Sequence, residues 1–262
     1  MTLFFAFIGL LVGGVVNRLT DRLPQRHSLL KLGACASCGR PYEWGGFLAV
    51  AAFLLRRGRC RGCATPLPLR PILVEIALFL IIPFLWQQNG GGGIFLAKSF
   101  YAAVFVLVSA VDFEHRRILN VVIYPSIAVA LSASLLRIGH ETRLEGVVGC
   151  VVGFVFFYLV FLLGEVLMSA LRRGGGGPAL GAGDVKLAAF IGLVAGWPGV
   201  IPALMLGIVL GGLGALVTLV AQVARRAYKP LTSALPYGPF LAAGGLAMVL
   251  WGEAIVRWWL RA

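Results

Sequence analysis

Eight long apolar segments, separated by short polar stretches, dominate this chain of 262 residues. A bilayer core about 30 Å thick needs roughly 20 mostly apolar residues per helical span. Lipid cannot satisfy free backbone groups, so such segments fold as helices rather than as open strands. Hydrophobic residues make up 60% of the chain and charged residues only 13%, which excludes a soluble globular domain. The segments run near 2–18, 71–86, 94–111, 118–136, 146–171, 184–197, 199–224 and 238–260.

These segments predict an all-α polytopic membrane protein with about eight transmembrane helices. We expect the first transmembrane helix at 1–19, a small cytosolic loop domain at 20–70, and a membrane core at 71–262 with about seven further helices. The segment at 184–197 is the shortest of the eight.

The basic residues predict the orientation of the chain, because Lys and Arg concentrate in cytoplasmic loops. If the N-terminus is outside, the loops at 20–70, 112–117, 172–183 and 225–237 face the cytosol. Counting Arg18 and Lys186 at the helix ends, that side holds 18 of the 23 Lys and Arg. The net charge of +13 then reflects topology and attraction to anionic lipid headgroups. The expected partner is therefore the lipid bilayer and not nucleic acid, for which the chain has no motif.

Two CxxC pairs lie in the 20–70 loop, formed by Cys35 with Cys38 and by Cys60 with Cys63. Two such pairs at this spacing are typical of a four-thiolate zinc site. Two disulfides are the alternative, but thiols stay reduced in the cytosol. We expect a structural Zn²⁺, because four thiolates leave no open position for a catalytic water.

Only three aspartates occur in the chain, and two of them, Asp112 and Asp184, lie where a long apolar segment meets a basic one. Two carboxyl groups held close together cannot both ionise readily, so the pair presents one base and one acid, as in aspartic proteases. Gly181 and Gly183 flank Asp184 on its N-terminal side and would let an extended substrate backbone come close. The pair is therefore a candidate catalytic site.

Two other interpretations of the aspartates remain open from placement alone. They could be ordinary interfacial carboxylates neutralised by Arg116, Arg117 or Lys186, or the cation-binding residues of a transporter. A GxGD string by itself is weak, because the chain contains 35 glycines.

Six short motifs occur in order along the chain: Gly13–Asn17 with Asp21–Pro24, the CxxC pairs with Leu54–Cys60 leading into the second, Leu69–Glu75, Asp112–Asn120, Ala179–Leu187 and Pro236–Phe240. Together these strings resemble the bacterial type IV prepilin peptidases, an A24-type family of membrane aspartic proteases. By this resemblance, Asp112 and Asp184 are the catalytic residues, and Gly181, Gly183 and Lys186 are their motif partners. Asn17 and Glu75 also match family positions.

The resemblance implies an enzyme of the bacterial inner membrane that cuts the basic leader of type IV prepilins, or of type II secretion pseudopilins, at the cytosolic face. Many members also methylate the new N-terminus with S-adenosylmethionine, an activity associated with the cysteine loop. The loop departs from the family pattern at 44–51, which lacks the usual Asn-Ile-Pro string, and in its first pair, which reads CASC. These changes bear on methyl transfer and not on the aspartates.

A second protease class, the presenilin and signal-peptide-peptidase type, also uses a GxGD motif. Members carry the first aspartate in a YD motif and have a Pro-Ala-Leu motif near a late span. Here Val111 precedes Asp112, and Pro178-Ala179-Leu180 precedes the GxGD string instead of following it. This class therefore stays as the alternative, ahead of a cation-coupled transporter.

Overall fold

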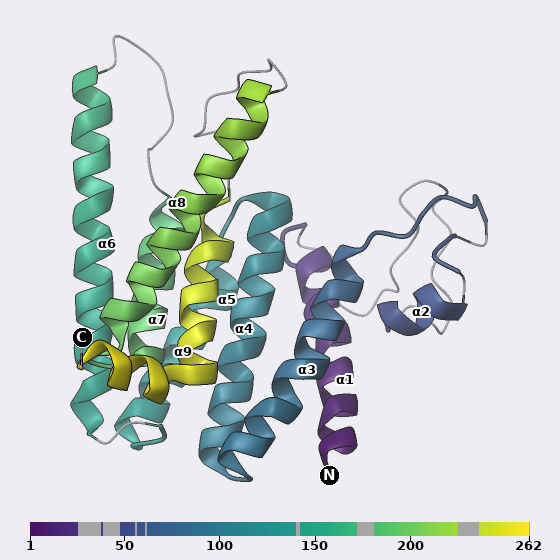
Figure 1. The fold of residues 1–262 in the computed structure, drawn as a ribbon, viewed down its shortest axis with the longest axis horizontal. Coiled ribbons are helices and arrows are strands. Elements are labelled where there is room, and N and C mark those ends of the chain that lie inside the picture. The colour runs from purple at the N-terminus through teal and green to yellow at the C-terminus, as the bar shows by residue number, and fades with distance from the viewer. Residues whose placement is uncertain are drawn as a thin grey trace. The chain divides into compact units, whose positions relative to one another are not determined.

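The computed structural model describes residues 1–25, 38, 48–55, 57–60, 62–139, 142–171, 181–224 and 236–261, without the side chains of residues 143, 167, 168, 170 and 171. Within these ranges the regular elements are all α-helices (Figure 1), and the one β-bridge, between Arg59 and Pro66, is isolated. The chain divides into two compact units, residues 1–111 and 112–262. Each unit is built around apolar helices.

The first unit is built on two helices that approach closely through glycines. Helix α1 (Thr2–Arg22) packs against α3 (Arg70–Asn89), and the short α2 (Ala49–Leu55) also packs against α3. Gly9 and Gly13 face α3 at the small-xxx-small spacing that brings membrane helices together. A Cβ on Gly13 would lie 2.7 Å from the Cα of Glu75, so no larger residue fits there.

An aromatic cluster joins the far end of this helix pair to α4 (Gly93–His115). The rings of Phe5 and Trp86 stack with centroids 3.9 Å apart, and Phe95 meets both rings edge-on, at 5.2 Å and 5.4 Å. Offset stacked and edge-on pairs are the favoured arrangements of aromatic rings. Most of α4 belongs to the first unit, and its end, from Asp112 onward, belongs to the second.

The second unit surrounds one central helix, α7 (Ala182–Ala195), which contacts each of the other four helices of the unit. Nine of its 14 residues are buried, and none after Ala182 is exposed. A helix that is apolar on all sides must be enclosed by protein or by lipid, and here protein encloses it. The surrounding helices are α5 (Asn120–Leu135), α6 (Arg143–Leu171), α8 (Val200–Ala224) and α9 (Gly238–Trp259).

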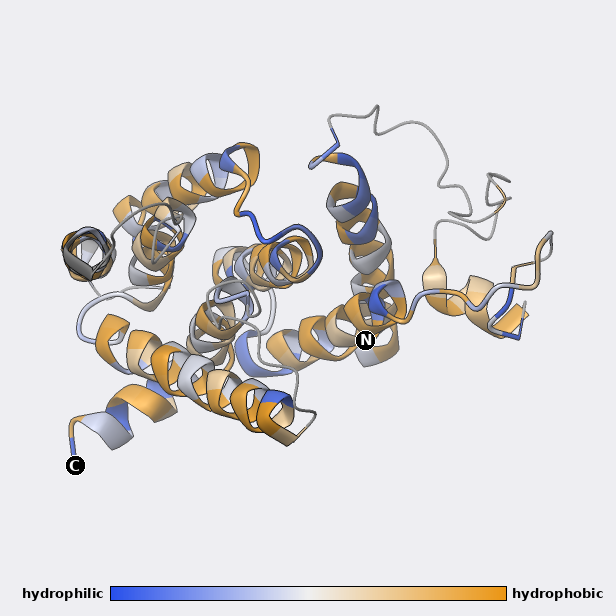
Figure 2. Ribbon diagram, turned by 90° about the horizontal axis from the view of Figure 1, so that it is seen from above, coloured by the Kyte–Doolittle hydropathy of each residue, from blue (hydrophilic) through white to orange (hydrophobic). Residues whose placement is uncertain are grey.

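The outer faces of the helices are apolar, as expected of surfaces that face lipid rather than water (Figure 2). On α6, for example, Leu159 is 58% exposed and Leu163 is 69% exposed. Among the described residues, six helices are long and apolar enough to cross a membrane: α1, α3, α4, α8, α9 and residues Leu144–Val166 of α6.

Eight helices lie where the apolar segments predicted them, so the all-α membrane fold is confirmed. The prediction of eight spans is supported only in part, because α5 has 16 residues and α7 has 14. At 1.5 Å per residue, α7 is about 21 Å long, which is short of the roughly 30 Å bilayer core. Helix α2 was not predicted, since it lies inside the polar loop and has only seven residues.

Candidate functional site

The carboxyl group of Asp112 lies at the start of another helix. Asp112 is near the end of α4 and is only 6% exposed. Its Oδ2 accepts a hydrogen bond of 3.0 Å from the backbone N–H of Gly238, the first residue of α9. Helix N-termini carry free N–H groups and a partial positive charge, both of which stabilise an anion. The positive charge of Arg116 acts on the same carboxyl group.

Asp184 also lies at a helix N-terminus, in the first turn of α7, and is 9% exposed. Gly181 is the N-cap residue of α7, and its carbonyl accepts a hydrogen bond of 3.0 Å from the N–H of Asp184. The two predicted catalytic residues are therefore both buried, and each lies beside the N-terminal end of a helix.

The carboxyl groups of Asp112 and Asp184 lie close enough within the second unit for the charge of Asp112 to act on Asp184. They come from positions 72 residues apart in the chain. Two interacting carboxyl groups in a poorly solvated site favour a state with one ionised and one protonated member. Such a pair can accept a proton at one oxygen while it donates a proton from another.

Two residues next to the aspartates were missed by the sequence reasoning as site residues. A Cβ on Gly238 would lie 2.6 Å from Asp112 Oδ2, so only glycine allows the carboxyl group to approach this N–H. Burial and the charge of Asp184 raise the pKa of the neighbouring Tyr237 to about 12, which keeps its hydroxyl neutral. Both Tyr237 and Gly238 belong to the Pro236–Phe240 string. In the sequence, that string indicated a resemblance to the family but assigned no function to either residue.

The glycines before Asp184 have packing reasons in addition to the predicted one. A Cβ on Gly181 would lie 3.2 Å from Asp184 Oδ2, and a Cβ on Gly183 would lie 2.9 Å from the Cβ of Ile118. Gly183 therefore lets α7 begin close to the chain that follows α4. The access of a substrate backbone stays a prediction.

Lys186 lies two residues after Asp184 and contacts α5. Its Nζ donates a hydrogen bond of 2.7 Å to Asn120 Oδ1 and lies 5.1 Å from the centroid of the Tyr124 ring. The side chain thereby ties the start of α7 to the start of α5.

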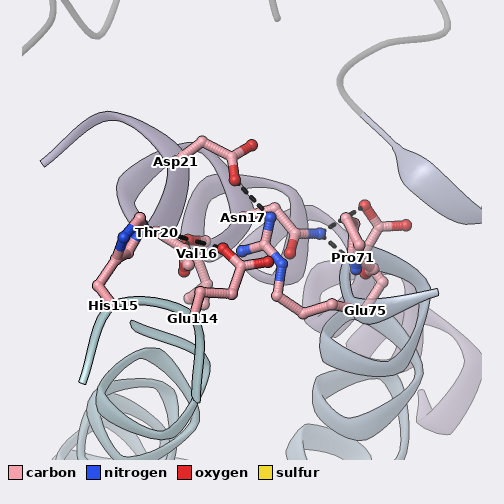
Figure 3. Close-up of polar contacts among 9 residues, drawn as sticks. Val16, Asn17, Thr20, Asp21, Pro71, Glu75, Glu114 and His115 are labelled. Carbon is pink, nitrogen blue, oxygen red and sulfur yellow. Dashed lines mark hydrogen bonds and ion pairs between the residues drawn. The ribbon is translucent and has the colours of Figure 1, made fainter. Parts of the chain in front are cut away.

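Asn17 and Glu75, the other two predicted motif residues, lie together in the first unit. Asn17 Nδ2 donates to Glu75 Oε1 at 3.2 Å and to the carbonyl of Pro71 at 2.9 Å (Figure 3). Both side chains are buried. They connect α1 to α3.

Three of the four predicted metal ligands also lie together, and Cys35 lies outside the described residues. The Sγ atoms of Cys38, Cys60 and Cys63 all fall within 4.8 Å of one another, a geometry that could hold a metal ion. The Sγ atoms of Cys38 and Cys60 are 3.9 Å apart, close to the roughly 3.8 Å expected between thiolates of a tetrahedral zinc site. The N–H of Gly62 points to Cys60 Sγ at 3.5 Å. These residues fit a thiolate-bound metal.

Two family models cover most of the chain. Residues 99–216 match the model described as the type IV leader peptidase family, and residues 7–88 match the bacterial peptidase A24 N-terminal domain. The first match contains both aspartates and the second contains both cysteine pairs.

The chain is also similar to several curated bacterial proteins named prepilin leader peptidase/N-methyltransferase. The protein of Burkholderia pseudomallei (strain 1026b) is 31% identical over 233 residues, which cover 88% of this chain and 71% of the relative. That of Pseudomonas putida is 26% identical over 271 residues, 95% of this chain and 90% of the relative. That of Pseudomonas aeruginosa is 28% identical, covering 97% and 91%. No solved structure is significantly similar to the chain.

Proposed function

The chain belongs to the type IV leader peptidase family, and on that premise we propose that it is a membrane aspartic endopeptidase. Its substrates are type IV prepilins or type II secretion pseudopilins, from which it removes the basic leader. The observation that carries this proposal is the pair of buried, interacting carboxyl groups of Asp112 and Asp184 at two helix N-termini. A family name alone would not identify the reacting atoms.

In this mechanism the ionised carboxylate takes a proton from a water molecule, whose oxygen attacks the scissile carbonyl carbon. The protonated carboxyl group donates its proton to the carbonyl oxygen as that oxygen becomes negative. The tetrahedral species then collapses, the C–N bond breaks, and the leaving amine takes up a proton. No covalent bond to the enzyme forms. Water supplies the hydroxyl group of the new C-terminus and the hydrogen of the new N-terminus.

The surroundings of the pair favour Asp112 as the base and Asp184 as the acid. Asp112 accepts the N–H of Gly238 and feels the positive charge of Arg116, and both interactions stabilise its ionised form. Asp184 lies among buried apolar residues of α7 and faces the negative charge of Asp112. The neutral hydroxyl of Tyr237 beside Asp184 is available as a hydrogen-bond donor.

The basic loops and the family together support a multi-pass protein of the bacterial inner membrane. With 18 of 23 Lys and Arg on one side, we assign that side to the cytosol. The start of α7, which contains Asp184, then lies on the cytosolic side, where a prepilin presents its leader. The presenilin-type alternative is not favoured, because both matching family models are of the A24 type.

The second activity in this proposal is methylation of the new N-terminal amine, with S-adenosylmethionine as the co-substrate that supplies the methyl group. The printed name of the curated relatives supports it. Cys35, Cys38, Cys60 and Cys63 would hold a structural Zn²⁺ in the loop that precedes α3, and the spacing of the three described thiols supports such a site. The metal would stabilise a loop too small to bury much core by itself.

Replacing each aspartate by asparagine tests the peptidase. Asp112→Asn and Asp184→Asn each remove an ionisable group without a change in volume, and each should slow leader removal at least about 100-fold. Asp21→Asn is the matched control, since Asp21 is exposed and pairs with Arg70. Mass spectrometry of a co-expressed prepilin measures leader loss and the added methyl group together. Full processing by both mutants would overturn the assignment.

A further inference from the structure

The side chain of Glu75 makes contacts that leader cleavage does not explain. Glu75 lies on α3 and is completely buried. Its Oε1 accepts the backbone N–H of Ala49 at 2.6 Å, and its Oε2 accepts the backbone N–H of Val50 at 2.8 Å. These are the first two residues of α2, the helix in the cysteine loop. The carboxylate of Glu75 therefore caps the N-terminus of α2, although the two are far apart in the first unit's sequence.

This contact replaces a cap that α2 lacks in its own sequence. The first N–H groups of a helix have no partner within it and are usually capped by the side chain of the preceding residue. The residue before α2 is Leu48, which has no side-chain acceptor. A helix of seven residues is also too short to be stable alone. Among the described helices, α2 packs mainly against α3.

Asn17 joins α1 to the same carboxylate. Its Nδ2 donates to Glu75 Oε1 (Figure 3). With the N–H groups of Ala49 and Val50, three donors from two other helices therefore converge on one side chain. Burying a carboxylate is costly unless hydrogen bonds compensate it, and all three partners are donors that suit the ionised form. Gly13 makes the approach possible, because a Cβ there would lie 3.0 Å from Glu75 Cγ.

A continuous set of backbone contacts connects α2 to the cysteines that follow it. The N–H of Gly58 donates to the carbonyl of Phe53 in α2 at 2.9 Å, and the carbonyl of Gly58 accepts the N–H of Leu67 at 2.9 Å. Gly58 has a φ of +72°, and a Cβ there would lie 2.9 Å from the Phe53 ring. Within this turn, the N–H of Cys60 donates to the carbonyl of Thr65 at 2.9 Å. The position of α2 thus sets the position of Cys60.

We propose that Glu75 is a positioning residue that fixes α2 on α1 and α3 and thereby places the cysteine loop for methyl transfer. The effect on methyl transfer rests on the second activity under Proposed function, whereas the anchoring of α2 stands by itself. In this assignment Asn17 orients the carboxylate, and Gly13 leaves room for it. The Gly13–Asn17 string, the Leu69–Glu75 string and the start of α2 are then joined by one network of contacts.

Glu75→Gln tests the anchor, because the amide keeps the volume and replaces one acceptor oxygen by an NH₂ group that faces a backbone N–H. Glu253→Gln, an exposed position on α9, is the matched control. Amide hydrogen exchange, followed by mass spectrometry in detergent, should be at least tenfold faster over residues 48–55 in Glu75→Gln and unchanged in Glu253→Gln. Exchange within twofold of wild type over that segment would overturn the anchor.

The same variants, co-expressed with a prepilin, test the link to methyl transfer. In Glu75→Gln the ratio of methylated to cleaved product should fall at least tenfold, whereas a general loss of folded protein would lower both products together and overturn the positioning role. If Glu75→Gln does not accumulate, Asn17→Ala removes one of the three donors and should give a smaller shift in the same direction. A wild-type protein that leaves the leader intact refutes the peptidase, whereas the exchange result still decides the anchor.

Discussion

Gly238→Ala should impair leader removal through Asp112 without touching either aspartate. The new Cβ would lie 2.6 Å from Asp112 Oδ2 and 2.9 Å from its Cγ, whereas ordinary contacts begin at 3.4 Å. The carboxyl oxygen must therefore move by roughly 0.8 Å, and misplacements of about 1 Å can cost about 100-fold in rate. A hydrogen bond to a charged group contributes about 1.5–3 kcal/mol, or about 10- to 150-fold in rate. We expect leader removal to slow by one to two orders of magnitude.

The assay is the initial rate of leader removal from a purified prepilin in proteoliposomes, at equal amounts of folded enzyme. Gly212→Ala is the matched control, because a Cβ on Gly212 in α8 meets nothing within 4 Å. It should retain the wild-type rate. If Gly238→Ala cleaves within threefold of Gly212→Ala, the hydrogen bond from Gly238 does not hold Asp112 for catalysis, and the base is positioned in another way.

Three further predictions concern stability and metal. Burial raises the folded-state pKa of Tyr237 from 10.0 to about 12. The stability that its neutral form contributes is therefore complete below pH 10 and is lost as the pH rises from 10 to about 12. In thermal melts over that pH range, Tyr237→Phe should lose less stability than the wild-type protein. Gly13→Ala should separate α1 from α3 and lower the free energy of unfolding by about 1–3 kcal/mol, measured against Gly212→Ala; an unchanged melting temperature would contradict the close contact. Elemental analysis should find about one Zn²⁺ per chain, and Cys38→Ser should remove most of it; equal zinc in both would argue against the thiolate site.

The helices of the membrane region could be predicted because lipid imposes a simple rule on sequence. A run of apolar residues about as long as the bilayer core is wide has to be helical, and the segments at 71–86 and 238–260 became α3 and α9 within a few residues of the predicted bounds. The rule does not tell a lipid-facing helix from an enclosed one. The short length of α7 was indicated by the segment at 184–197, but its enclosure by protein was not.

The aspartates could be predicted because a carboxyl group at the end of an apolar segment is costly and rare. Gly238 could not, since a backbone N–H leaves no chemical signature in a sequence and acts only once α9 begins beside Asp112. Glu75 matched a motif, but its role depends on α2, a helix too short for periodicity to reveal. In both cases the missing information is a contact between segments far apart in the chain.

The enclosure of α7 has a consequence for how the enzyme responds to its membrane. A helix at the lipid boundary tilts or shifts when the hydrocarbon thickness changes, to limit hydrophobic mismatch. Because no residue of α7 after Ala182 is exposed, acyl chains do not set its depth, and α7 follows α5, α6, α8 and α9 instead. The packing of these neighbouring helices, and not the lipid, therefore sets the depth of Asp184 in the membrane. Bilayers of different thickness would then shift the lipid-facing helices before they change the position of Asp184.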